Sequence, residues 1–413
     1  MMNSCSGTAH SASAAPVPAG AVHLWRWIGP ACALVLFHLG AVAPPARAAV
    51  PRIVAYYDGG MPVAEIPAAK LTDIIYAFGE PDDSDVCSAP TPGQLRTFRE
   101  LRRLRRRHAG LRLLLSIGGW DAAPQYSDIA LTAAGRARFA HSCVRLFIEQ
   151  QRFDGIDLDW EFPVHGGMNK SRPRDRADAT ALARALRRRL DVLGRRTHRH
   201  YLLTMATPAG TWQQGGAYSV SDSYDLAALA PIVDWLNVMT YDMNNIFSPV
   251  SGFNTPLAAD PRDPQPLAER ALDNLTAAVR DYEAHGVPAA KIMLGVAFYG
   301  RGFTGVAARD AGRYSRYAGG YPETPWKTVA SHFLTDPDWV RHWSATAQAP
   351  WLYNARRHIF FTYDDPLSIA IKAGFARRER LGGVMIWVLG EDDAQDSLLN
   401  ALAAHLRPAG SPP

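Results

Sequence analysis

The sequence offers little of what a metal or redox centre requires. Its 413 residues include four cysteines, and no two of them have a CxxC spacing. An HExxH motif and other spacings typical of metal ligands are absent, and so is a glycine-rich phosphate loop. The sequence therefore predicts a protein that works without a metal ion or an organic cofactor.

The net charge is small and the charges are mixed in sign. Lys and Arg total 44 and Asp and Glu total 39, which gives a formal net charge of +5. Two of these cations, Arg26 and Arg47, fall in the first 48 residues, which hold no acid, so 42 cations face 39 anions in the remainder. The arginine runs at 102–107 and 187–189 lie opposite the apolar residues of their helices, where we expect solvent. No nucleic-acid partner is predicted.

The N-terminus has the pattern of an export signal. Arg26 precedes an apolar run from Trp27 to about Ala43, and Ala46-Arg47-Ala48 supplies small residues for cleavage. The alternative is a membrane anchor, but the run is interrupted by Pro30 and is shorter than the ~20 residues that a span requires. We therefore expect a signal peptide over residues 1–48 and a secreted or periplasmic protein with no membrane segment after cleavage.

Removal of the signal would leave two cysteines, Cys87 and Cys143. In an oxidising compartment they could form a disulfide. They could equally be two unrelated thiols, with Cys143 buried on a helix. The sequence leaves both alternatives open.

From residue 49 onward, eight short apolar segments alternate mostly with amphipathic ones, a pattern that predicts a parallel sheet closed as a (β/α)8 TIM barrel over residues 49–413. The predicted strands are Ile53–Tyr57, Asp73–Phe78, Leu111–Ile117, Phe153–Glu161, Tyr201–Ala206, Ile232–Thr240, Lys291–Tyr299 and Gly383–Leu389. The predicted helices are Gln94–Arg107, Gly135–Gln151, Asp175–Leu193, Asp225–Ala230, Pro266–His285, Leu367–Arg380 and Ala394–Leu406.

Residues 302–361 lack a long helical pattern, which predicts a small domain inserted after the seventh strand. The chain shows no repeats and no Ser/Gly linker that leads to a second module. We expect a monomer.

The fourth predicted strand carries an unusual set of acids. Apolar residues and acids alternate along it, so Asp157, Asp159 and Glu161 share one face and Ile156, Leu158 and Trp160 share the other. Like charges on an enclosed strand are costly unless they share protons, and chains keep such groups mainly where they do chemistry. Asp154 has the opposite parity, so we expect it to have a structural role.

Polar and aromatic residues also end the other strands, where the active site of a (β/α)8 barrel forms. They occur in Ser116–Trp120, in Met239–Asp242, in Phe298–Arg301 and at Trp387. Aromatic rings stack on sugar rings and carboxyl groups cleave glycosidic bonds, so the combination predicts a carbohydrate site.

These segments resemble one known family. Asp154–Glu161 matches the DGxDxDxE signature of the family 18 glycoside hydrolases, the chitinases. The resemblance continues, in the family's order, at Ser116–Gly119, Met239–Asp242, Phe298–Arg301, Tyr363–Pro366 and Gly382–Trp387. It covers Ile53 to Leu406, and it implies that the inserted domain is the α+β insertion of bacterial chitinases.

The resemblance implies a substrate-assisted retaining mechanism. Glu161 would be the general acid, and the substrate's own N-acetyl oxygen would be the nucleophile. Asp159 would hold the acetamido group and share a proton with Asp157, and both aspartates would raise the pKa of Glu161. Tyr241 would hydrogen-bond the acetamido oxygen. The expected substrate contacts are Asp242, Arg301, Trp387, Met239, Tyr56, Phe78 and Trp120.

The predicted function is an exported chitinase that binds chitin or N-acetylglucosamine oligosaccharides and hydrolyses their β-1,4 linkages. One alternative is an endo-β-N-acetylglucosaminidase acting on N-glycans or a peptidoglycan-type substrate. Another is a non-catalytic chitin-binding lectin, although such proteins usually lack the acid that Glu161 supplies here. Four tryptophans could be outer sugar platforms or loop core: Trp120, Trp212, Trp326 and Trp339.

Overall fold

The structure is a computed structural model that describes residues 50–406, apart from 83, 85, 122–124, 166–169, 213–217 and 220–222. The predicted signal peptide at 1–48 lies outside the described residues and stays a prediction. Among the residues described, no helix is both long and apolar enough to cross a membrane.

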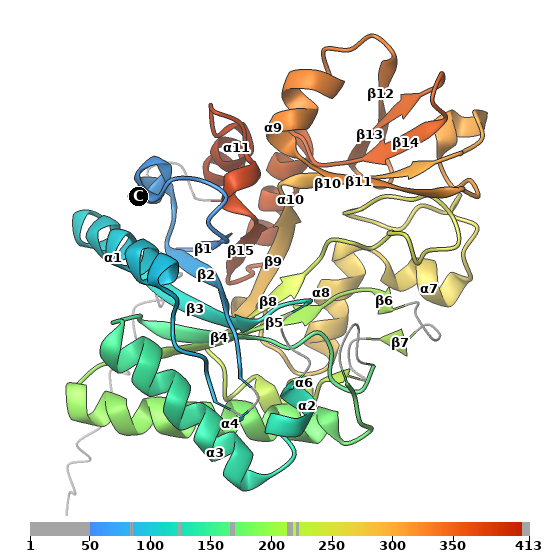
Figure 1. The fold of residues 1–413 in the computed structure, drawn as a ribbon. Coiled ribbons are helices and arrows are strands. Elements are labelled where there is room, and N and C mark those ends of the chain that lie inside the picture. The colour runs from blue at the N-terminus through green and yellow to red at the C-terminus, as the bar shows by residue number, and fades with distance from the viewer. Residues whose placement is uncertain are drawn as a thin grey trace, which may run out of the picture. The chain divides into compact units, whose positions relative to one another are not determined.

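Eight parallel strands close into a barrel in the order β1-β15-β9-β8-β5-β4-β3-β2 (Figure 1). Their bounds are β1 Arg52–Tyr57, β2 Asp73–Gly79, β3 Arg112–Gly118, β4 Gly155–Asp159, β5 Leu202–Pro208, β8 Trp235–Met239, β9 Ile292–Ala297 and β15 Gly383–Trp387. Each of the eight predicted strands therefore overlaps a strand of the barrel, and the predicted (β/α)8 fold is confirmed.

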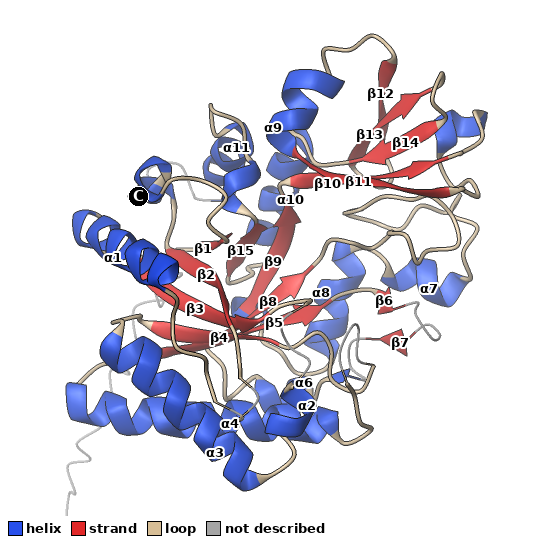
Figure 2. Cartoon of the chain, in the orientation of Figure 1, coloured by secondary structure: helices blue, strands red, loops and turns tan. Residues whose placement is uncertain are grey.

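Helices lie outside the strands (Figure 2). Their bounds are α1 Pro92–Arg107, α2 Tyr126–Ile129, α3 Ala133–Cys143, α4 Asp175–Thr197, α6 Leu226–Leu229, α7 Leu267–Leu272, α8 Leu275–Ala284, α10 Pro366–Arg378 and α11 Ser397–Leu406. Local sequence explains where two of them begin. Thr91 and Gln94 form a capping box at α1, Asp365 and Ser368 form one at α10, and both helices have proline in their first turn.

Two predicted helices differ from the observed ones. The helix predicted over Gly135–Gln151 changes at Val144 into a π-helix that ends at Gln150. The helix predicted over Pro266–His285 is broken between α7 and α8, because the Asn274 side chain accepts a hydrogen bond from the backbone of Ala277 and so caps a new helix. Apolar periodicity does not reveal either change.

The barrel strands separate two cores, because successive side chains point to opposite faces. Outward-facing residues such as Ile156 and Leu158 pack with the helices, whereas Tyr56, Leu114 and Met385 pack inside the barrel. Asp154 precedes β4 and accepts hydrogen bonds from Arg105 (2.6 Å), Arg199 (2.7 Å) and the backbone of Leu113 (3.0 Å). Asp154 therefore ties together the segments that enter β3, β4 and β5, the structural role expected from its parity.

An antiparallel sheet occupies the predicted insertion, with the strand order β11-β10-β14-β13-β12. Its strands are β10 Tyr299–Thr304, β11 Gly319–Pro325, β12 Trp339–Ser344, β13 Ala349–Asn354 and β14 Ile359–Thr362, and a short helix, α9 Trp326–Thr328, follows β11. The sheet begins three residues before the predicted boundary, because β10 follows β9 almost directly. Trp326 and Trp339 are 5% and 7% exposed and belong to the core, so neither is a sugar platform.

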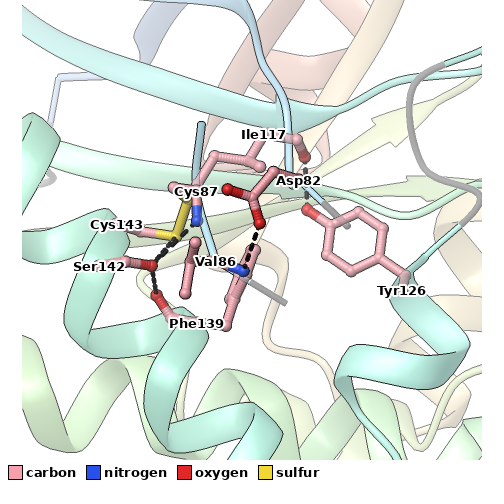
Figure 3. Close-up of a disulfide and its surroundings, with 8 residues drawn as sticks. All are labelled: Asp82, Val86, Cys87, Ile117, Tyr126, Phe139, Ser142 and Cys143. Atoms are coloured by element: carbon pink, nitrogen blue, oxygen red, sulfur yellow. Dashed lines mark hydrogen bonds between the residues drawn. A yellow bond between two sulfur atoms is a disulfide. The ribbon is translucent and has the colours of Figure 1, made fainter. Parts of the chain in front are cut away.

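Cys87 and Cys143 form a disulfide, which decides between the two alternatives left open by the sequence (Figure 3). The bond joins the loop after β2 to the last residue of α3, with the Cα atoms 5.1 Å apart. Ser142 supports it by accepting a hydrogen bond from the backbone of Cys87 (2.9 Å) and donating one to the carbonyl of Phe139 (2.9 Å).

Replacing both cysteines by alanine should lower the free energy of unfolding by about 2–4 kcal/mol, because the bond closes a loop across 56 positions and restricts the unfolded chain. Guanidinium denaturation of the variant and the wild type measures the difference. Wild-type protein unfolded and refolded with a reductant should match the variant, and the variant should not respond to reductant. A wild type that is equally stable with and without reductant would contradict the disulfide.

Candidate active site

A cavity of about 740 Å³ opens at the C-terminal ends of the barrel strands. Ten of the predicted site residues line it: Tyr56, Phe78, Trp120, Asp159, Glu161, Met239, Tyr241, Asp242, Arg301 and Trp387. Asp157 lies two residues before Asp159 on β4 and is fully buried. The structure thus brings together, around one cavity, residues that are up to 331 positions apart in the sequence.

Asp157 accepts four hydrogen bonds inside the barrel, and each donor belongs to a different strand. The donors are Tyr56 on β1 (2.7 Å), Ser116 on β3 (2.8 Å), Thr204 on β5 (2.5 Å) and Asn237 on β8 (3.0 Å). Burial raises the pKa of Asp157, and these hydrogen bonds oppose the rise because they favour the charged form. Asp157 is therefore held in a fixed place and orientation.

Asp159 has a different environment from Asp157. Its side chain is buried, and its Oδ1 atom accepts no hydrogen bond within the described structure. Burial raises the pKa of Asp159 well above its usual range, and the nearby charges of Glu161 and Asp157 raise it further. Asp159 therefore binds a proton more tightly than a carboxyl group in water does.

Glu161 follows β4 and is half-buried at the cavity wall. Its pKa is raised to about 8, first by burial and then by the charges of Asp242 and Asp121. The direction agrees with the expectation from sequence, whereas the causes differ, because the sequence pointed to Asp157 and Asp159 and the structure gives burial, Asp242 and Asp121. The repulsion between Glu161 and Asp159 acts instead on the pKa of Asp159, which the charge of Glu161 raises.

Glycines give the cavity floor its close packing. Gly118 and Gly119 have positive φ values of 109° and 94°, in the region that side chains other than glycine rarely adopt. A Cβ atom on Gly118 would lie 2.1 Å from the carbonyl oxygen of Asp159, and one on Gly119 would lie 2.8 Å from the ring of Phe78. Together with Ser116, which bonds Asp157, these residues shape the site from below.

Aromatic rings form the walls. The Trp387 ring lies 5.4 Å from the Tyr56 ring and is stacked 5.8 Å from the Phe78 ring, measured between centroids. Tyr241 is 9% exposed and also lines the cavity. Burial raises the pKa of the Tyr241 hydroxyl well above its usual value, and nearby carboxylates raise it further, so it remains a hydrogen-bond donor.

Asp242 and Arg301 form the polar wall. Arg301 binds both carboxylate oxygens of Asp242, and the Tyr299 hydroxyl donates to the same carboxylate at 2.6 Å. Arg301 also forms an ion pair with Glu323 at 3.0 Å. Sequence reasoning missed Glu323, which comes from β11 of the insertion, because no spacing relates it to the barrel motifs.

Several other lining residues were missed as well. Asp121 follows the Ser116–Trp120 segment directly, so its place beside that motif could have identified it as a site residue. Ile246 and Phe247 line the cavity in the loop after β8 and are 59% and 43% exposed, which is high for large apolar side chains. Within the described chain, no three His, Cys, Asp or Glu side chains are grouped as a metal site requires.

Glu161→Gln should stabilise the protein more at pH 8 than at pH 5. In the wild type the folded pKa of about 8 exceeds the usual value of 4.5, so between these values the folded state holds a proton that the unfolded state has lost, and stability falls as pH rises. Glu161→Gln has no titrating group at this position, so it does not lose stability in this way as pH rises. Thermal unfolding should show the difference in Tm between variant and wild type growing by roughly 2–5 °C from pH 5 to pH 8.

The control for this measurement is Glu100→Gln, on the exposed face of α1. It should leave the pH dependence of Tm as in the wild type. A Tm difference for Glu161→Gln that is equal at both pH values would contradict the raised pKa of Glu161.

Comparison with known proteins gives the family. Residues 52–392 match the model for glycosyl hydrolases family 18. Chitinase A1 of Niallia circulans is 36% identical over 339 residues, 80% of this chain and 47% of that protein, and chitinase B of Serratia marcescens is 30% identical over 409 residues, 84% of this chain and 79% of that protein. A solved family 18 N-acetylglucosaminidase from Paenibacillus barengoltzii has a TM-score of 0.77 at 32% identity, over 86% of this chain and all of that one. The chain therefore belongs to glycosyl hydrolases family 18.

Proposed function

We propose that this protein is a chitinase that hydrolyses β-1,4 linkages between N-acetylglucosamine units with retention of configuration, using the substrate's acetamido group as nucleophile. The observation that carries the proposal is the row of acids on β4 and just after it. Glu161 lies at the cavity wall with its pKa raised to about 8, and burial also raises the pKa of Asp159 and of Asp157. A carboxylic acid that keeps its proton at neutral pH is what protonation of a glycosidic oxygen requires.

In the first step, Glu161 donates its proton to the leaving glycosidic oxygen while the acetamido oxygen attacks the anomeric carbon. The bond to the leaving sugar breaks and a cyclic oxazolinium ion forms. Asp159 accepts a hydrogen bond from the acetamido N–H, and Tyr241 donates one to the acetamido oxygen. Asp157 takes up the proton that Asp159 gives up, so negative charge develops beside the cation.

In the second step, the Glu161 carboxylate removes a proton from water as that water attacks the anomeric carbon. The ring opens to the original acetamide and the configuration is retained. Glu161 ends with its proton restored, so the cycle needs no metal and no carboxylate nucleophile. Asp242, the neighbouring acid, is occupied with Arg301 and Tyr299, which supports a role in binding sugar hydroxyls.

The aromatic walls support binding of sugar rings. The Trp387 ring packs against the rings of Tyr56 and Phe78, and all three line the same cavity as Glu161. The cavity of about 740 Å³ falls within the usual range of ligand sites, about 300–1,000 Å³. Trp120 and Met239 extend its apolar lining, as the family resemblance implies.

A second candidate activity is release of single N-acetylglucosamine units. It is favoured by the likeness to the Paenibacillus N-acetylglucosaminidase, which the match covers completely, whereas the match spans only about half of chitinase A1. The residues described for the site serve either activity. A time course of products from the N-acetylglucosamine hexamer separates them, since a chitinase yields oligomers first and the second candidate yields monosaccharide first.

Two further readings compete with the proposal. An endo-β-N-acetylglucosaminidase acting on N-glycans or a peptidoglycan-type substrate would use the same acids, and the insertion that adds Glu323 to the cavity favours the longer chitin groove. A non-catalytic lectin would not need a proton on Glu161. We also propose that the protein is a monomer exported by the signal at 1–48, and the disulfide fits an oxidising compartment.

Glu161→Gln should lower kcat on N-acetylglucosamine oligomers by at least about a thousandfold while leaving their Kd within about tenfold, because the amide keeps its shape but has no proton to give. Reducing-end assays and calorimetry measure the two quantities. Glu100→Gln should keep wild-type activity. Substantial hydrolysis by Glu161→Gln would end the assignment of Glu161 as the acid.

Fully deacetylated glucosamine oligomers should not be cleaved, because they lack the acetamido oxygen that acts as nucleophile. Hydrolysis of the acetylated hexamer should yield the β-anomer first, as seen by NMR within the first minutes. Initial release of the α-anomer, or rapid turnover of the deacetylated oligomers, would contradict the substrate-assisted step.

A further inference from the structure

Asp242 occupies an unusual backbone conformation directly after β8. Its φ is 60°, in the left-handed region that residues other than glycine adopt infrequently. In this conformation its carboxylate reaches both Tyr299 and Arg301 on β10. Aspartate tolerates the left-handed region better than most residues, but the surrounding structure still has to select it.

The Asp242 carbonyl accepts a hydrogen bond from the Asn245 side chain at 3.1 Å, and two further hydrogen bonds of this turn converge on one residue, Asn254. The side-chain oxygen of Asn254 accepts from the backbone N–H of Asp242 at 2.8 Å, and its main-chain carbonyl accepts from the next N–H, that of Met243, at 3.0 Å. Asn254 is fully buried. The backbone N–H groups on either side of the left-handed residue therefore both donate to Asn254.

Asn254 is itself held from the other side. Its backbone N–H donates to the Thr362 hydroxyl on β14 at 3.0 Å. The next residue, Thr255, donates to Asp364 at 2.8 Å and accepts from the Lys372 ammonium on α10 at 2.6 Å. Lys372 and Asp364 form an ion pair with both side chains fully buried.

A buried ion pair whose members are also hydrogen-bonded has few alternative arrangements. Ser368 adds a further hydrogen bond to Asp364 at 2.6 Å. The path from Lys372 through Asp364 and Thr255 to Asn254 therefore links α10, the helix that precedes the last barrel strand, to the wall of the cavity.

We propose that Asn254 is a positioning residue, which holds Asp242 in its left-handed conformation so that the carboxylate faces Arg301 and the cavity. Asn254 is not among the residues that line the cavity. The effect of Asn254 on catalysis rests on the proposed function, because Asn254 would act through Asp242 on substrate binding and on the pKa of Glu161.

The link to Glu161 gives the inference a distinctive signature. After burial, the charge of Asp242 is the largest influence that raises the pKa of Glu161. If Asp242 turns away, this repulsion weakens and the pKa of Glu161 falls. Activity requires protonated Glu161, so the alkaline limb of the kcat/KM profile should move to lower pH.

The test is Asn254→Leu, which has a similar volume and no acceptor. The Nδ2 atom of Asn254 has no hydrogen-bond partner within the described structure, so the substitution chiefly removes the oxygen that holds Asp242. We expect kcat/KM on N-acetylglucosamine oligomers to fall by about 10- to 100-fold, as misplacement of a binding group does. The alkaline limb, near pH 8 in the wild type, should shift down by about half a pH unit.

The matched control is Asn244→Leu. Asn244 is another buried asparagine of the same loop, and it bonds Phe253 and Gln265 instead of Asp242. This control should lower stability without moving the alkaline limb. If Asn254→Leu does not fold, Asn254→Ala is measured in the same way.

A crystal structure of the Asn254 variant tests the positioning role of Asn254 without an activity assay. Asp242 should leave the left-handed region and lose at least one of its contacts with Arg301. An unchanged φ at Asp242 with the Arg301 contacts intact would overturn the proposal, as would an alkaline limb that stays in place. Failure of the wild type to hydrolyse any N-acetylglucosamine oligomer would refute the proposed function alone, and the crystal structure would still decide the role of Asn254.

Discussion

The site depends on the exclusion of water from three carboxyl groups that lie along one strand. Burial raises the pKa of Asp157, Asp159 and Glu161, so each binds protons more tightly than it would in water. The three carboxyl groups differ in their hydrogen-bond partners and in their position relative to the cavity. Asp157 receives four hydrogen bonds, Asp159 has an oxygen with none within the described structure, and Glu161 lies at the cavity wall. One physical constraint thus yields three proton affinities.

Closure of the barrel makes these differences possible. The four donors to Asp157 come from β1, β3, β5 and β8, and only a closed sheet brings such strands around one side chain. The insertion then completes the cavity on one side. Its first strand provides Tyr299 and Arg301, and its second provides Glu323, so the polar wall is an ion-pair network shared by barrel and insertion.

Much of the fold could be read from the sequence, because apolar periodicity and chain order are local signals. The eight barrel strands, the acidic face of β4, the exclusion of Asp154 and the position of the insertion follow from such patterns. The break before α8 could not be read, since it depends on a side chain that caps a helix within an apolar stripe. Trp326 was equally undecidable, because an aromatic ring in a loop looks the same whether it faces sugar or core.

The sequence by itself determined on which strand face the acids lie, since alternation along β4 is a property of any extended chain, and from that it predicted which residues carry the chemistry. Only the tertiary structure decided the burial and charges that set their pKa values, and the hydrogen bonds that hold their neighbours in place. The pKa of Glu161 depends on burial and on Asp242, a residue 81 positions away whose conformation is set by Asn254. The pairing of Cys87 with Cys143 was decided in the same way, because distance in space between remote residues is not written in their spacing along the chain.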